Sequence, residues 1–212
     1  LENDSKRTYV AQSGLIGLNG PDSSRNGRPM YEVEQSAYSL ADAKSVASKD
    51  GKTHQVLTVP LVFKTPEGVE VIKTFTFAQG EYPVTVQHQV INRSQQNWQG
   101  QMFGQLKRDN SDDPGKSSQG IFTLGTYLGG AWGTPEEPYN KLKFANFNDE
   151  KLNVEAKGGW VAMVQHYFVS AWIPGKLKLT QADGQPYTAK LESRQSADSM
   201  NIIGFTSPVI NV

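Results

Sequence analysis

An alternation of apolar and polar residues with a period of two constrains this chain more than any other feature. Between residues 57 and 90, three consecutive runs place apolar side chains at every second position. Short turns rich in Gly, Pro, Glu and Gln separate these runs at residues 66–68 and 79–81. Alternating runs joined by short turns predict an antiparallel meander. Pro60 cannot donate a ladder hydrogen bond, so it predicts an edge strand or a bulge there.

The same pattern continues through most of the chain and predicts one mostly-β domain over residues 1–212. Further strands are expected at residues 8–12, 30–40, 98–107, 121–128, 176–182, 187–193 and 200–206. Asp183-Gly184 predicts a hairpin turn between two of them. Residues 14–29 read as a loop, 41–49 as a short helix or loop, and 129–148 as a long connection rich in aromatic residues. At this length, two large packed antiparallel sheets with little helix are expected.

Composition excludes several classes of function. The 212 residues are enough to bury a core without a disulfide, and the chain has no cysteine to form one. The 21 Lys and Arg residues balance 21 Asp and Glu residues, which argues against a nucleic-acid partner. The absence of cysteine suits an oxidising compartment, although many cytosolic proteins share it. No apolar stretch reaches the length of a transmembrane helix.

The most polar stretch, residues 108–120, is predicted to be a mobile surface loop. Its acidic residues begin like a calcium-binding loop, but Gly120 stands where a bidentate acid would complete the ligand set. Lys116-Ser117 follows Gly115 as in a phosphate-binding loop, but Asn110 replaces the required first glycine. We therefore expect no metal and no cofactor.

The three histidines, His54, His88 and His166, share no metal-ligand spacing. His88 lies in the apolar row of its run, which predicts a neutral imidazole on the inner face of a sheet. His166 could in principle perform acid–base chemistry on a sugar together with a carboxylate such as Glu155. Nothing in the sequence requires that pairing, so no catalytic residue is assigned.

An aromatic segment at residues 157–174 reads as a pair of core strands. Gly158-Gly159 would give a tight entry, and Pro174 would end the element. Trp160 and Trp172 are expected in the core because continuous apolar sequence surrounds them.

At this segment the sequence resembles the large periplasmic domain of the YidC family of membrane protein insertases. The shared motifs are Gly158-Gly-Trp-Val-Ala-Met163, Tyr167-Phe168, Ala171-Trp-Ile-Pro174, Ala11-Gln-Ser-Gly-Leu15, Gly20-Pro-Asp22, Phe103-Gly-Gln-Leu-Lys107, Thr134-Pro-Glu136, Tyr139, Lys143-Phe144 and Ile203-Gly-Phe205. The resemblance covers nearly the whole chain. The family's preceding transmembrane helix and initial strands, its linker helix and its membrane core have no counterpart in the printed sequence, so we expect one domain of a longer protein.

The resemblance implies a β-supersandwich similar to galactose mutarotase. It also implies a position on the periplasmic side of the bacterial inner membrane, association with the Sec translocon accessory subunits SecD and SecF, and contact with nascent inner-membrane proteins through the parent protein. The domain would be a non-enzymatic interaction scaffold. The alternative is a carbohydrate-binding or mutarotase-like domain, because fold alone does not decide function. A ligand in a surface cleft of such a domain could also be fortuitous.

A scaffold of this kind needs a partner surface, which we place within residues 125–174. Trp132 and Tyr139 are flanked by Gly, Pro and Glu, as expected for exposed anchors in a loop. They are the predicted partner-binding residues. The competing interpretation is that both side chains only pin their loop to the sheet.

Overall fold

The computed structural model describes residues 2–4, 7–23, 27–47, 53–111, 127–165, 167–177 and 185–212. Regular structure in these residues is predominantly antiparallel β-sheet. Its helices are single 3₁₀ turns at Pro21–Ser23 (η1), Leu40–Asp42 (η2) and Phe144–Asn146 (η3). The predicted mostly-β class with little helix is confirmed. Among the described residues, no helix has the length and apolar character of a membrane span.

The chain divides into two compact units. Unit 1 contains Leu1–Gly14 and Gln101–Val209, and unit 2 contains Leu15–Gly100 and Ile210–Val212. Strands β2 (Thr8–Ile16) and β7 (Gln99–Arg108) contribute residues to both units. Each unit therefore gathers segments that are distant in the sequence.

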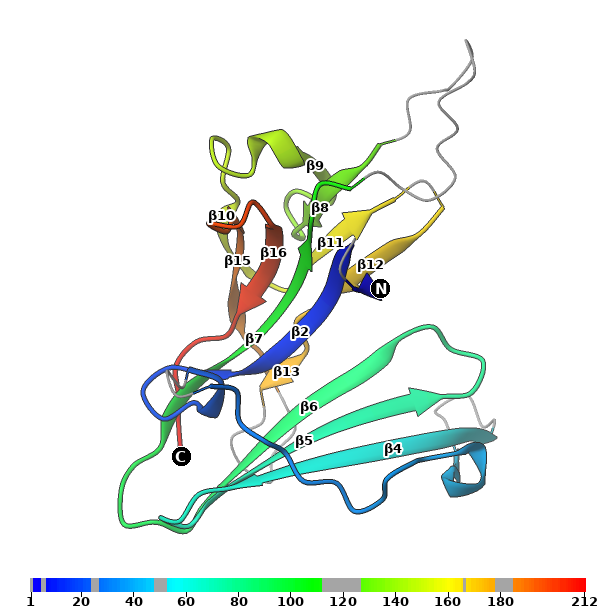
Figure 1. Ribbon diagram of the computed structural model, residues 1–212, viewed down its shortest axis with the longest axis vertical. Coiled ribbons are helices and arrows are strands. Elements are labelled where there is room, and N and C mark those ends of the chain that lie inside the picture. The colour runs from blue at the N-terminus through cyan, green and yellow to red at the C-terminus, as the bar shows by residue number, and fades with distance from the viewer. Residues whose placement is uncertain are drawn as a thin grey trace. The chain divides into compact units, whose positions relative to one another are not determined.

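Unit 1 is built on two sheets. Its remaining strands are β1 (Glu2–Asn3), β8 (Gly129–Gly133), β9 (Asn140–Lys143), β10 (Asn153–Lys157), β11 (Trp160–Val164), β12 (Val169–Trp172), β13 (Lys176–Leu177), β14 (Gln185–Pro186), β15 (Thr188–Gln195) and β16 (Asn201–Thr206). The large sheet has the order β1-β2-β7-β16-β15-β10, and the small sheet has the order β12-β11-β8-β9 (Figure 1). Strands β13 and β14 form a separate two-stranded ribbon.

The core of unit 1 lies between these two sheets. Alternate residues of the large sheet, such as Leu106, Leu191 and Ile203, pack in one buried cluster with Val161 and Met163 of the small sheet. Two sheets that share one apolar layer form a β-sandwich, so the prediction of packed antiparallel sheets holds within this unit.

Two glycines let bulky side chains approach the strands of this sandwich. A Cβ atom at Gly104 of β7 would lie 2.6 Å from Phe205 Cε1 and 2.9 Å from Trp172 Cδ2. At Gly130 of β8 it would lie 2.8 Å from Phe147 Cζ. Both distances are far below van der Waals contact, so any side chain at either position would displace the core.

Unit 2 contains the predicted meander. Its sheet has the order β3-β4-β5-β6, formed by β3 (Lys44–Ala47), β4 (Thr53–Lys64), β5 (Val69–Ala78) and β6 (Val84–Asn92) (Figure 1). The apolar positions of adjacent strands face each other, as in the pairs Val59–Phe75 and Phe75–Val86. The meander between residues 57 and 90 is therefore confirmed. Unit 2 also holds β17 (Ile210–Asn211), which pairs with the first residues of β7.

Pro60 lies in β4 opposite Thr74 of β5. Val62 exchanges backbone hydrogen bonds with Glu32 on the side of β4 away from β5. Because backbone groups alternate along a strand, residue 60 turns its nitrogen to that same side. Within the described residues, β3 pairs only with residues 53–56 of β4. Pro60 therefore occupies a local edge, as predicted.

Three local predictions were wrong. Residues 30–40 form a single bridge, Glu32 to Val62, rather than a strand, and a capping box at Ser39 starts η2. Residues 44–47 form strand β3 rather than a helix or loop. Residues 129–148 contain strands β8 and β9 instead of one long connection. The sequence of β8 shows no alternation of apolar and polar residues, because three of its five residues are glycines without a side chain.

The predicted polar loop was wrong at its first residue, because Arg108 belongs to a strand. It is the last residue of β7, pairs with Asn201 of β16 and is only 1% exposed. Its guanidinium carbon lies 5.4 Å from the ring centroid of Tyr9 and 5.9 Å from that of Phe144. A planar cation can stack on aromatic rings inside a core. The sequence predicted a surface position for this arginine, without such stacking.

Some predictions lie outside the described residues. These are positions 121–126 of the strand predicted at 121–128, positions 178–182 of the strand predicted at 176–182, the turn at Asp183-Gly184, the loop positions 112–120 and His166. Residues 127–128 are described and are not in a strand. The strand predicted at 98–107 is β7, and the one at 200–206 is β16. The segment 160–174 supplies the antiparallel pair β11 and β12, entered through Gly158 and Gly159 with φ of 88° and 120°.

Candidate functional site

The small sheet of unit 1 has two faces, and the register assigns every side chain to one of them. Val161 of β11 lies opposite Trp132 of β8 and Trp172 of β12. Opposed residues share a face. Val161 is fully buried, and both tryptophans pack against the core cluster. This row is therefore the inner face.

The outer face carries an aromatic pair. Trp160 lies opposite Gly133, whose missing Cβ would be 2.7 Å from Trp160 Nε1. The indole thus occupies the space beside the glycine. The ring of Tyr139, just before β9, lies 6.0 Å from that of Trp160, and Tyr139 is 55% exposed. This pair extends the apolar surface toward solvent.

Strand β12 adds exposed aliphatic side chains to the same face. Val169 at its start and Ile173 just after its end are 64% and 71% exposed, and Ala171 between them is also exposed. Ala131 and Ala162, in the middle of the sheet, are fully buried. The exposed apolar area therefore lies along β12 and at the Tyr139–Trp160 pair. We call Tyr139, Trp160, Ala171 and Ile173 the outer apolar surface.

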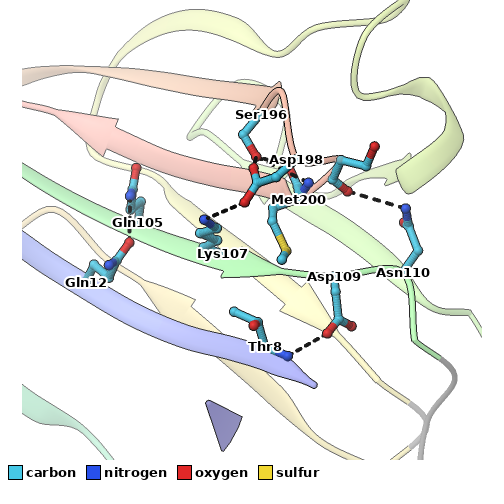
Figure 2. Close-up of polar contacts among 10 residues, drawn as sticks. Thr8, Gln12, Gln105, Lys107, Asp109, Asn110, Ser196, Asp198 and Met200 are labelled. Carbon is cyan, nitrogen blue, oxygen red and sulfur yellow. Dashed lines mark hydrogen bonds and ion pairs between the residues drawn. The ribbon is translucent and has the colours of Figure 1, made fainter. Parts of the chain in front are cut away.

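The outer face of the large sheet is polar by contrast. The Gln105 side-chain amide donates to Gln12 Oε1 at 2.9 Å, and Lys107 Nζ lies 3.4 Å from Asp198 Oδ2. Figure 2 shows both contacts. Arg194 donates to the Gln105 side-chain oxygen at 2.9 Å. The polar groups of this layer are therefore already paired with one another. An apolar partner is therefore better accommodated on the small sheet.

Cationic side chains border the outer apolar surface. Lys141 and Lys143 project from β9 beside Tyr127, and Lys141 Nζ lies 5.0 Å from the centre of the Tyr127 ring. The Tyr127 hydroxyl donates to the carbonyl of Gly130, and burial raises its pKa. An apolar patch with a polar rim is the usual composition of a protein interface.

Of the two predicted partner residues, Tyr139 lies where it was predicted and Trp132 does not. Tyr139 is exposed as expected. Trp132 lies in strand β8 and packs against the core, so its place in an exposed loop was wrong. Trp172 is on the core side as predicted, whereas Trp160 is half-buried on the outer face. Sequence alone could not assign these faces, because both faces of β11 are apolar.

Comparison with known proteins decides the family. The family model described as "YidC periplasmic domain" matches residues 1–212, which includes both units. The chain belongs to the YidC periplasmic domain family. It is 43% identical over all of its length to a protein from Azotobacter vinelandii named membrane protein insertase YidC, of which the match covers 34%. A protein of the same name from Alcanivorax borkumensis is 45% identical over 176 residues, 82% of this chain and 28% of that protein.

The same name belongs to a Pseudomonas putida (strain GB-1) relative that is 43% identical over 212 residues and of which the match covers 34%. The chain thus spans about a third of the length of these relatives. The YidC periplasmic domain family predicted from the sequence motifs is confirmed.

The carbohydrate-active alternative depended on an acid and a base meeting in one cleft. His88 of β6 in unit 2 has both ring nitrogens buried, and within the described residues neither has a hydrogen-bond partner. Burial, and to a lesser extent the charge of Lys73 opposite it, lower its pKa to about 4. Its inward orientation agrees with the prediction. A neutral imidazole beside a cation is poorly suited to accept a catalytic proton.

The segment that begins like a calcium-binding loop has a structural role at its first residue. Asp109 accepts a hydrogen bond from the Thr8 backbone N–H, shown in Figure 2, and another from the Ser111 N–H at 2.9 Å. This carboxylate therefore ties the start of β2 to the end of β7. In the part of the chain that the structure describes, no three His, Asp or Glu residues gather in a group that could hold a metal ion.

Proposed function

We propose that this chain is the periplasmic domain of an inner-membrane protein insertase and acts as a non-catalytic interaction scaffold. In this proposal it lies on the periplasmic side of the bacterial inner membrane. Its partners are the Sec translocon accessory subunits SecD and SecF, and the parent protein contacts nascent inner-membrane proteins. Family membership supports the location and the insertase role, since the relatives are named membrane protein insertases.

The observation that carries the scaffold role is the difference between the two outer faces of unit 1. The large sheet presents hydrogen-bonded polar side chains, and the small sheet presents the outer apolar surface. Solvent-facing aromatic residues bordered by cations match the anchors and rim of protein interfaces. Of the two predicted partner residues, this proposal retains Tyr139. It replaces Trp132 with Trp160, because Trp132 packs inward.

Co-purification tests the proposal in the full-length parent protein. Tyr139→Ser combined with Ile173→Ser should reduce recovery of SecD and SecF from solubilised membranes about ten-fold, the loss expected when interface anchors are removed. Val209→Ser is the matched control, because Val209 is a 50% exposed apolar residue of unit 1 outside this surface. Unchanged recovery with the double variant would contradict the assignment. A panel of hexoses in calorimetry tests the carbohydrate alternative, and binding tighter than millimolar would favour it.

A further inference from the structure

Three consecutive large side chains at the end of the β11–β12 turn and the start of β12 are exposed to solvent. Tyr167, Phe168 and Val169 are 82%, 73% and 64% exposed. A hydrogen bond from the Gln165 N–H to the Phe168 carbonyl, 2.8 Å long, holds the turn together. We call Tyr167, Phe168 and Val169 the hairpin tip. Side chains this exposed on a short, hydrogen-bonded turn protrude from the unit rather than line a groove.

With its one histidine, His166, counted as neutral, the sequence around the hairpin tip carries no formal charge. Residues 164–175 contain no Asp, Glu, Lys or Arg, although such residues make up 20% of the chain. Exposed turns of water-soluble domains are ordinarily polar. An uncharged, apolar tip costs little to move out of water, whereas one carboxylate or ammonium group there would oppose that transfer.

The small size of the hairpin tip favours a bilayer over a protein as its occupant. A stable protein interface needs about 800 Å² and 20–30 residues on each side, which a turn with three exposed side chains does not provide. A bilayer interface needs no complementary shape and accepts single aromatic and aliphatic side chains. Tyrosine suits the headgroup level, because its ring is apolar and its hydroxyl is polar.

We propose that the hairpin tip inserts into the headgroup and upper acyl region of the membrane beside which this domain is held, with Phe168 deepest. This inference rests on the proposed location at the membrane and is independent of SecD and SecF. Insertion of a few side chains is weak by itself. A domain attached to the same membrane experiences a high effective concentration of lipid, so weak insertion is enough to orient it.

A fluorescent label can test this insertion because the chain has no cysteine of its own. Phe168→Cys in the whole 212-residue chain is labelled with an environment-sensitive nitrobenzoxadiazole dye. The chain is held by a terminal histidine tag on vesicles of phosphatidylethanolamine and phosphatidylglycerol that contain a nickel-chelating lipid. Val209→Cys with the same label is the matched control. We expect a blue-shifted emission at position 168, at least three-fold stronger quenching by doxyl lipids than at position 209, and loss of the shift when Tyr167→Ser and Val169→Ser are added.

Equal emission and equal quenching at positions 168 and 209 would overturn the proposal. A photoreactive group at position 168 of the full-length parent that crosslinks to a protein, without lipid quenching in the vesicles, would overturn it in favour of a protein contact. The vesicles contain no SecD or SecF, so this experiment and the co-purification can fail independently. A circular dichroism spectrum of each labelled chain checks that the sheets are intact.

Discussion

The rings of Tyr139 and Trp160 lie 6.0 Å apart at an interplanar angle of 34°, and the indole fills the space beside Gly133. Strand β11 and the residue before β9 thus meet through an aromatic pair on the outer face. Gly133 permits this arrangement because a Cβ atom there would lie 2.2 Å from the Pro138 carbonyl oxygen and 2.7 Å from Trp160 Nε1. The outer apolar surface therefore depends on a residue without a side chain.

Gly133→Ala should lower the free energy of unfolding by about 1–3 kcal/mol, because a methyl group must displace backbone as well as the indole. Urea denaturation measures this change. Gly175→Ala is the control, since no atom lies within 4 Å of the position of its Cβ. Equal midpoints for the two variants would show that the β8–β9 connection yields without cost.

Trp132→Ala should destabilise the domain by about 3 kcal/mol, as expected for a large-to-small change against a core. Trp132 packs against the core cluster, whereas Trp160 is half-buried on the outer face. Trp160→Ala should therefore cost less, about 1–2 kcal/mol, because fewer of its contacts are internal. Thermal or urea unfolding of both variants measures which of them loses more stability. A greater loss in Trp160→Ala would contradict the assignment of the two faces.

Arg108→Lys should reduce stability by about 2 kcal/mol even though it keeps the charge. The planar guanidinium lies within 6 Å of the rings of Tyr9 and Phe144 and donates to the Ser111 carbonyl at 2.9 Å. An ammonium group cannot stack in the same way. Lys107→Arg on the exposed side of β7 is the control and should change stability by less than about 0.5 kcal/mol. Because Arg108 is buried, trypsin should not cleave there before the domain unfolds, and early cleavage at Arg108 would refute its burial.

His88 should make stability depend on pH in mildly acidic solution. Burial lowers its pKa from 6.5 to about 4, so the unfolded chain binds more protons between these values. Its contribution to stability is complete above pH 6.5 and is lost as the pH falls toward 4. His88→Leu should be nearly neutral at pH 7 and should retain about 2 kcal/mol more stability than the parent chain at pH 4.5.

Urea unfolding at pH 7 and pH 4.5 measures this difference between the two proteins. Carboxyl groups that titrate in the same range are present in both proteins, so the comparison isolates the imidazole. His54→Gln is the control for the replacement of a histidine as such. Parallel pH profiles for the parent chain and His88→Leu would show that the imidazole is hydrated in the folded state.

The strands of unit 2 could be predicted because their alternation is local. Leu57, Val59 and Leu61 already mark one face, and the short turns at residues 66–68 and 79–81 leave adjacent antiparallel pairing as the simplest connection. Pro60 indicated a local edge because it lacks a backbone N–H. The motifs around residues 158–174 likewise identified the family, because they are specific and occur in a fixed order.

Only the tertiary structure decided which surface is available to a partner. Trp132 and Trp160 both occur beside glycine and valine or alanine in apolar sequence, yet the register of β8 against β11 turns one inward and the other outward. Alternation along a strand implies that the side chains of neighbouring residues lie on opposite faces of the sheet. It does not indicate which of the two faces the core. Arg108 shows the same limit. Its burial depends on the rings of Tyr9 and Phe144, residues 99 and 36 positions away in the sequence, and contacts at that separation are set by how the sheets pack.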